Sequence, residues 1–314
     1  MRTLLAGILL AGSAVAQPSR VLTLAVPEGA SSFVLAKSGK IAAAALQNHK
    51  LQLWSLPEGR TLRTIDLGGR NIDILAISAD GALLAGGDHA GGYNVWNTAT
   101  GAQQMQLKLP YYPMAIAFSA DAKRLAIAPA NQPVQVYDPA SGRKLFELQR
   151  PVGGTQAVVF SPDGSRIATA DSDTVVRVYD SRNGELLSRN ADFLMEPLTA
   201  AFSADGKQVV AGGGDKVIAL LDAGSGRAIR SSAKVADPVA YMEVSPDGSL
   251  LAAVLMHADN MLMPGALLIS EMSSGNKVVE WHPEKLPVGG AWTVDGHLLV
   301  ATAGEKAIEI WRVR

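Results

Sequence analysis

The 314-residue sequence contains no cysteine, and this absence removes several classes of site at once. Without thiols the chain has no disulfide, no zinc–thiolate centre, no cysteine nucleophile and no attachment point for a c-type haem. Stability must therefore come from packing and hydrogen bonding. With 48% hydrophobic and 18% charged residues, the composition suits a well-packed core in one large β domain or two ordinary domains.

An excess of charge of either sign is also missing. The chain has 28 Lys and Arg residues against 29 Asp and Glu residues, which gives a formal net charge of −1. No long block of one sign stands out in the sequence. Because binding to a phosphate backbone depends on clustered cations, we expect no nucleic-acid partner.

Recognisable catalytic motifs are absent as well. The sequence contains no G-x-S-x-G, no H-E-x-x-H, no phosphate-binding loop and no dinucleotide fingerprint. An enzyme of the families that carry these motifs is therefore excluded, and other kinds of enzyme are not.

Long hydrophobic runs are restricted to the N-terminus. Arg2 precedes an apolar stretch at residues 4–10, and Ala14-Val15-Ala16 has the small-x-small pattern of a cleavage site. This pattern is typical of a secretory signal peptide, residues 1–16, with residues 17–314 as the mature protein. The alternative is a membrane anchor, but only about a dozen apolar residues precede the polar break, against roughly 20 for a spanning helix. We expect a periplasmic or secreted bacterial protein with no membrane span.

One short turn sequence, Ser-x-Asp-Gly, recurs along the rest of the chain. The middle copies are spaced by 41 or 42 residues, and degenerate or shortened copies occur near both ends of the chain. The copies begin at Ser78, Ser119, Ser161, Ser203 and Ser245, with Val294-Asp295-Gly296 and Ser38-Gly39 as the degenerate ones. A fixed period of this length is the mark of a repeat protein.

Two further landmarks keep the same register. About 16 residues after the turn, the repeats have an aromatic or apolar residue followed by a polar one, with Ser270-Glu271 the weakest match, and six repeats have a glycine four residues after that polar residue. The first landmark falls at Trp54, Trp96, Tyr137, Tyr179, Leu221, Ser270 and Trp311. The glycines are Gly59, Gly101, Gly142, Gly184, Gly226 and Gly275. Seven copies of one unit account for almost the whole chain.

Each unit predicts four short strands. In the fourth copy an apolar run at 158–160 precedes the turn, a small-residue run at 167–170 follows it, and 176–179 alternates as a half-buried strand. A fourth run at 185–188 comes after the turn that ends at Gly184. Four strands in about 42 residues is the number and length typical of one propeller blade. The predicted fold is all-β, a seven-bladed β-propeller of four-stranded antiparallel blades.

The third-strand ends at Trp54, Trp96, Tyr137-Asp138, Tyr179-Asp180 and Trp311 resemble those of WD40 repeats. The resemblance covers residues 20–314. It departs from the family in one respect, because no blade carries the Gly-His pair that often precedes the first strand. Since WD40 proteins mostly act as scaffolds, the resemblance implies contact with a protein partner.

The ends of the chain predict how the ring closes. Residues 307–314 end the seventh copy without a fourth strand, whereas residues 20–26 precede the first copy and have no earlier sheet to join. We therefore expect residues 20–26 to supply the outer strand of the last blade, which would remove an exposed edge.

Binding residues are expected on the loops at one rim of the ring, because a rigid frame carries function there. Aromatic, Arg and Met residues beside the connections between blades are the candidates, since these types are enriched at interface anchors. They are Tyr111, Tyr112, Arg150, Phe193, Met195, Trp281 and His282. The alternative for each is packing against the adjoining blade.

No metal or cofactor is expected. His49, His89, His257 and His282 fall on one predicted rim, but they lack a paired ligand spacing and are interpreted as loop residues. Met256, His257, Met261 and Met263 are soft ligands that suit Cu(I). The competing interpretation is a packed loop, because methionine also fills irregular gaps.

These patterns together predict a non-catalytic binding or scaffold protein of the cell envelope that presents its rim loops to a protein partner. The alternative is a periplasmic propeller enzyme, lactonase-like or quinoprotein-like, with a site in the central channel. Such a site needs converging acidic and histidine side chains, and the predicted first-strand starts do not supply them: they are Asp73, Pro113, Thr155, Pro197 and Pro238. The recurrent turn aspartates are expected to cap their own hairpins.

Overall fold

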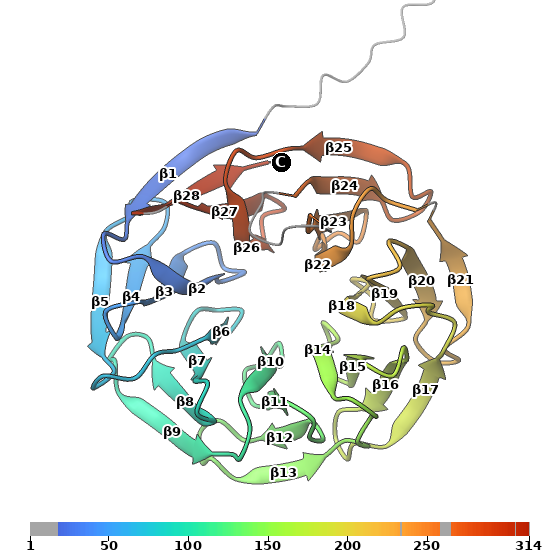
Figure 1. Ribbon diagram of the computed structural model, residues 1–314, viewed down its shortest axis with the longest axis horizontal. Coiled ribbons are helices and arrows are strands. Elements are labelled where there is room, and N and C mark those ends of the chain that lie inside the picture. Colours follow the sequence, from blue (N-terminus) through green and yellow to red (C-terminus); the bar gives the residue numbers. More distant parts are fainter. Residues whose placement is uncertain (1–17, 233, 258–264, 305, 314) are drawn as a thin grey trace, which may run out of the picture.

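A computed structural model describes residues 18–232, 234–257, 265–304 and 306–313. The predicted signal peptide, residues 1–16, lies outside them. The described residues form 28 strands in seven four-stranded antiparallel sheets, and they contain no helix. The sheets surround a central axis like the blades of a propeller, so the predicted fold is confirmed (Figure 1).

The strands fall into four groups by their place in the blade. The innermost strands are β2 (Ala30–Leu35), β6 (Ile74–Ile77), β10 (Pro113–Phe118), β14 (Thr155–Phe160), β18 (Pro197–Phe202), β22 (Val239–Val244) and β26 (Leu286–Trp292). The second strands are β3 (Ile41–Leu46), β7 (Leu83–Gly87), β11 (Leu125–Pro129), β15 (Arg166–Asp171), β19 (Gln208–Gly213), β23 (Leu250–Leu255) and β27 (Leu298–Ala303).

The third strands carry the aromatic landmark, and the fourth form the outer rim. The third strands are β4 (Lys50–Ser55), β8 (Gly92–Asn97), β12 (Gln135–Tyr137), β16 (Val176–Asp180), β20 (Ile218–Asp222), β24 (Leu267–Glu271) and β28 (Ala307–Arg312). The outer strands are β5 (Thr61–Asp66), β9 (Gln103–Lys108), β13 (Lys144–Glu147), β17 (Leu186–Asn190), β21 (Ala228–Ser231), β25 (Lys277–Trp281) and β1 (Ser19–Ala25).

The N-terminal strand closes the ring as the sequence predicts. The sheet of blade seven has the order β1-β28-β27-β26, and β1 runs antiparallel to β28 with Ser19 opposite Arg312. Figure 1 shows the blue N-terminal strand along the outside of the red C-terminal strands. Arg20 and Lys285 both donate to the carboxylate of Glu309, at 2.9 and 2.8 Å, which adds polar contacts to this seam.

The core consists of layers between neighbouring sheets. The second strands supply small side chains such as Ala43, which is fully buried, so that adjacent sheets approach closely. Larger residues of the next blade fill the remaining space. For example, Ala43 and Leu51 of blade one share a cluster with Leu84 and Trp96 of blade two.

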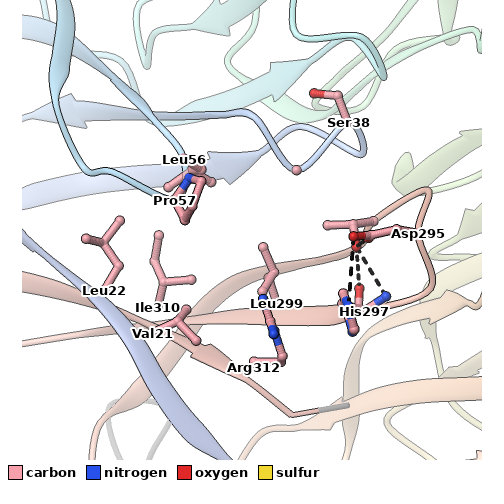
Figure 2. Close-up of a pocket in the computed structure, with 12 residues that line it drawn as sticks. Val21, Leu22, Ser38, Leu56, Pro57, Asp295, His297, Leu299, Ile310 and Arg312 are labelled. Carbon is pink, nitrogen blue, oxygen red and sulfur yellow. Dashed lines mark hydrogen bonds and ion pairs between the residues drawn. The ribbon is translucent and has the colours of Figure 1, made fainter.

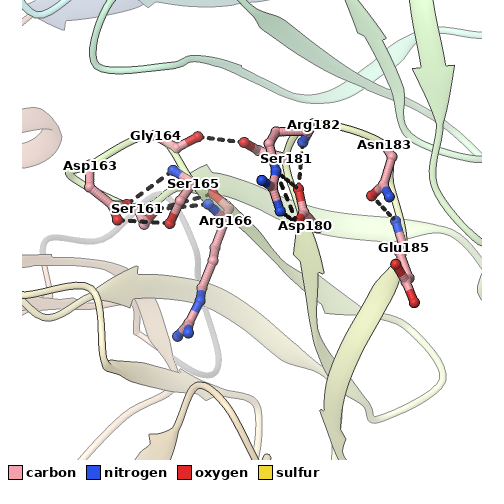
Figure 3. A network of polar contacts seen from close by, with 10 residues as sticks. All are labelled: Ser161, Asp163, Gly164, Ser165, Arg166, Asp180, Ser181, Arg182, Asn183 and Glu185. Atoms are coloured by element: carbon pink, nitrogen blue, oxygen red, sulfur yellow. Dashed lines mark hydrogen bonds and ion pairs between the residues drawn. The ribbon is translucent and has the colours of Figure 1, made fainter.

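The Ser-x-Asp-Gly turns are held by their own side chains, as expected. In blade four, Ser161 Oγ donates to Asp163 Oδ1 at 2.5 Å and accepts from the backbone N–H of Arg166 at 3.0 Å. Asp163 also accepts from the backbone N–H of Ser165 at 3.0 Å (Figure 3). The neighbouring turn at Asp180 is tied to the first one, because Ser181 Oγ donates to the carbonyl of Gly164.

The antiparallel strand order sorts all connections onto two faces of the ring. The links from second to third strands and the links between blades lie on one face, called here the loop face. The links from first to second strands and from third to fourth strands lie on the opposite face, called here the turn face.

Blade seven departs from the register of the other six. In blade four, Ile167 on the second strand pairs with Tyr179 on the third strand and with Phe160, which is the last residue of the first strand. In blade seven the equivalent residue, Val300, pairs with Gly290 and Trp311, and the ladder continues for two more pairs to Trp292–Leu298. The β26–β27 hairpin therefore extends further on the turn face than the hairpins of blades one to six.

Candidate functional site

Exposed apolar side chains concentrate on the loop face. Twelve large apolar side chains among the described residues are classed as exposed, and five of them lie on three successive connections between blades. These five, called here the apolar arc, are Tyr111, Tyr112, Val152, Leu194 and Met195. Leu194 and Val152 are the most exposed of the twelve, at 86% and 79%.

The two tyrosines are fixed by contacts with both neighbouring blades. The ring of Tyr112 stacks on His89, with centroids 5.0 Å apart and planes 10° from parallel. The carbonyl of Tyr111 accepts a hydrogen bond from Tyr93 Oη at 3.2 Å, and the carbonyl of Tyr112 accepts one from the N–H of Ala130 at 2.9 Å. The backbone of this connection and the ring of Tyr112 are therefore held in a defined position.

A buried charge network supports the Val152 connection. Arg177 forms ion pairs with Asp171 and with Asp173, each at 2.7 Å, and all three side chains are largely buried. Asp173 also accepts the backbone N–H of Val152. Burial raises the pKa of Asp171, whereas for Asp173 the effect of burial is outweighed by Arg177, so that the pKa of Asp173 lies below its usual value.

The third connection of the arc packs on the second-to-third-strand link of blade five. The carbonyl of Glu196 accepts the N–H of Gly214 at 3.1 Å. A Cβ on Gly214 would lie 3.4 Å from the side chain of Met195, so the methionine covers this glycine. The backbone that carries Leu194 and Met195 is therefore held in place, although the two side chains are exposed.

Four of the seven sequence-predicted binding residues lie along this part of the loop face: Tyr111, Tyr112, Arg150 and Met195. Phe193 is only 7% exposed and packs in the core cluster between blades four and five, which is the alternative that the sequence left open. Val152 and Leu194 were not predicted. The sequence feature that could have indicated them is an aliphatic residue within a connection between blades, as in Pro151-Val152-Gly153-Gly154.

Trp281 and His282 lie elsewhere on the ring, at the connection between blades six and seven (Figure 1). Trp281 is half-buried against Trp311, with ring centroids 5.3 Å apart. His282 is exposed, with Nε2 3.4 Å from Glu280 Oε1. The structure therefore does not bring these two residues together with the apolar arc.

The copper hypothesis falls partly outside the described residues, because Met261 and Met263 belong to the segment 258–264. Met256 and His257 are described and half-buried, and the Nδ1 atom of His257 is buried without a hydrogen-bond partner. Within the described part of the chain, no three His, Asp or Glu side chains are grouped as metal ligands.

Two polar side chains of the innermost strands are engaged in hydrogen bonds and ion pairs. Thr155, at the start of β14, donates to the buried carboxylate of Asp171 at 2.6 Å and so belongs to the network under Val152. The acidic residue Glu243 on β22 also has partners within the protein. It forms an ion pair with Lys37 at 2.8 Å and accepts a hydrogen bond from the backbone N–H of Trp292 at 2.9 Å. The Thr155 contact lies within blade four, whereas the Glu243 contacts link blade six to blades seven and one.

Comparison with known proteins identifies one repeat directly. Residues 145–180 match the family described as WD domain, G-beta repeat. This segment runs from the outer strand β13 of blade three through β14, β15 and β16 of blade four. The sequence repeat therefore spans two blades, because its first strand completes the preceding sheet.

A curated relative carries the same repeat name. The chain is 28% identical over 119 residues to the WD repeat-containing protein SL1-17 of Schistosoma mansoni. The match covers 38% of this chain and 40% of that protein, so the chain spans less than half the length of this relative. Separately, none of the described segments forms a helix with the length and apolar character to cross a membrane.

Proposed function

We propose that this seven-bladed WD40-repeat propeller is an exported, non-catalytic binding platform that engages a protein partner through the apolar arc of its loop face. Propellers of this kind typically serve as scaffolds for protein interactions. The observation that carries the proposal is the gathering of five of the twelve exposed large apolar side chains on three successive connections. Exposed apolar residues gathered on one face favour an interaction site, whereas singly scattered ones need no explanation.

The composition of the arc supports a protein ligand. Tyrosine and methionine are enriched at the centres of protein interfaces, and Arg150 lies at the same rim. Because the tyrosines and the Val152 connection are held by bonds to neighbouring blades, little ordering entropy is lost when a partner binds.

Site-specific photo-crosslinking in cells tests the proposal. A photoreactive amino acid replaces Leu194 or Val152 in the arc, and a matched control places it at Val294, which is 72% exposed on the turn face. We expect the same crosslinked protein from positions 152 and 194, and its loss when Met195→Asp is added. Adducts from position 294 alone, or adducts that persist with Met195→Asp, contradict the assignment of this face.

Export is a separate part of the proposal and is supported by the N-terminal pattern. Mass spectrometry of the protein purified from its native host gives the N-terminal peptide. We expect it to begin at Gln17. A peptide that begins at Met1 or Arg2 contradicts the proposed cleavage after Ala16.

A further inference from the structure

A cavity of about 250 Å³ lies on the turn face at the seam between blades seven and one (Figure 2). Its walls come from the closing strand β1, from two turns of blade one and from the β26–β27 hairpin with β28. The lining residues used below are Val21, Leu22, Leu56, Asp295, His297 and Arg312.

The cavity follows from the unusual register of blade seven. The β26–β27 ladder continues two pairs further than its counterparts, which places Thr293, Asp295 and His297 beside the turns of blade one. The N–H of Val294 donates to the carbonyl of Lys37 at 2.9 Å and fixes this position. The longer hairpin thus forms a wall of the cavity.

The lining divides into an apolar part and a polar rim. Figure 2 shows Val21, Leu22 and Leu56 toward one end and Asp295 with His297 toward the other. His297 Nε2 lies 3.9 Å from Asp295 Oδ2. The guanidinium of Arg312 makes no hydrogen bond or ion pair with any of the described residues, and it is the one arginine of the lining.

We infer that this seam cavity binds a small monocarboxylate with an aliphatic or aromatic tail, whose carboxylate pairs with Arg312. A guanidinium presents two parallel N–H donors that match a carboxylate. A cavity of 150 Å³ accommodates benzene, so by proportion a volume of about 250 Å³ accommodates roughly ten non-hydrogen atoms. The apolar end takes the tail.

Such a ligand also acts on ring closure. Because the cavity contacts β1 as well as blades one and seven, it exists only in the closed ring. A ligand that binds only the folded, closed state stabilises that state by mass action. The site lies on the face opposite the apolar arc, so this inference is independent of the proposed partner surface.

Calorimetric titration and thermal unfolding with two probes test the inference. The probes are 3-phenylpropanoate and its uncharged analogue 3-phenylpropanol, applied to the purified wild-type protein. The variants are Arg312→Gln, Val21→Trp and the matched control Leu62→Trp. Val21 and Leu62 lie on neighbouring outer strands with similar exposures of 39% and 40%, but only Val21 lines the cavity.

We expect the acid to bind the wild type with a dissociation constant on the order of 1 mM or tighter and to raise Tm. Arg312→Gln should weaken the acid about tenfold and leave the alcohol unchanged, since only the acid uses the guanidinium. Val21→Trp should abolish binding of both probes, and Leu62→Trp should change neither. Equal affinities for acid and alcohol, no saturation by about 10 mM acid, or normal binding by folded Val21→Trp would each overturn the inference.

Discussion

At the scale of single residues, the carboxylate of Asp247 organises its turn by accepting three hydrogen bonds. The donors are Ser245 Oγ at 2.5 Å, the backbone N–H of Ser249 at 3.0 Å and Ser249 Oγ at 2.7 Å. Together they lower the pKa of Asp247 to about 2. A carboxylate with a lowered pKa stabilises the fold fully above its unfolded pKa of roughly 4, and this contribution disappears as the pH falls toward 2.

Asp247→Asn should therefore lower Tm at pH 7 and flatten the loss of stability between about pH 4 and pH 2, because the amide does not titrate. Thermal unfolding followed by circular dichroism across this pH range gives the measurement. Glu58→Gln is the control, since Glu58 is exposed and its side chain bonds none of the described residues. An acid-unfolding curve of the Asp247→Asn variant parallel to that of the wild type would contradict the role of this aspartate.

The buried network of blade four allows a second residue-scale prediction. Arg177→Met leaves Asp171 buried with only the hydroxyl donors of Thr155 and Thr169. Leaving one partner of a buried ion pair uncompensated costs about 3–5 kcal/mol of unfolding free energy. Adding Asp171→Asn should recover part of this loss, because the buried charge is removed.

Denaturant unfolding of both variants gives these free energies. Arg182→Met serves as the matched control, because Arg182 forms an ion pair with Asp180 in the same blade but is largely exposed. Exposed pairs contribute little to stability, because water screens the two charges. Similar losses for Arg177→Met and Arg182→Met would show that burial does not set the strength of the network.

At the scale of secondary-structure elements, the closing strand β1 contributes core as well as backbone pairing. Leu24 is buried in the cluster that joins blades seven and one, together with Phe33 and Ile308. Leu24→Ala should cost about 2–5 kcal/mol, as for other buried leucines, and lower Tm by roughly 5–10 °C. Val21→Ala, on the same strand but partly exposed, should stay within about 0.5 kcal/mol of the wild type. Equal effects of the two substitutions on Tm would refute a core role for this strand.

The elements also show why the sequence predicts some features and not others. The turn aspartates and the third-strand aromatics recur because most blades use the same hydrogen bonds and a large side chain at the same place, and blades one to six share one register. Blade seven keeps these residues but pairs them differently, and its Val294 bonds to the turn of blade one. The seam cavity is lined by segments that lie far apart in the sequence, and no local pattern reveals that they meet.

The candidate site illustrates the same limit. Residue type correctly directs attention to the connections between blades, and Tyr111 and Tyr112 are exposed there. Residue type does not distinguish Phe193, which points into the core, from the adjacent Leu194, which points out. The direction of each side chain depends on the path of the connection over the next blade, and that path is a tertiary property.

At the scale of the whole molecule, the pairing in blade seven predicts that ring closure requires a strand beside β28, whatever the position of that strand in the sequence. In blade seven the N–H of Val313 donates to the carbonyl of Leu298. In blade four the N–H of Ser181 donates to the carbonyl of Ser165 in the same way, so the chain leaves strands β28 and β16 along equivalent paths. The position opposite Trp311 is occupied by Arg20, as Leu186 lies opposite Tyr179. A short turn could therefore join residue 313 directly to residue 19.

A circular permutant that begins at Pro27 and joins Val313 through Arg-Asn-Gly to residues 19–26 should retain the fold, with Tm within about 5 °C of the wild type. The bridge copies residues 182–184, which make the same connection in blade four, and the new termini lie at the exposed Pro27. The same chain without residues 19–26 loses Leu24 and Val26 from the core and should melt at least about 10 °C lower. Thermal unfolding of the two proteins separates the contributions, because they differ only in the closing strand and its bridge. Should the permutant melt with the truncated chain, the covalent order of β1 before β2 would itself be required for closure, and pairing with β28 would not suffice.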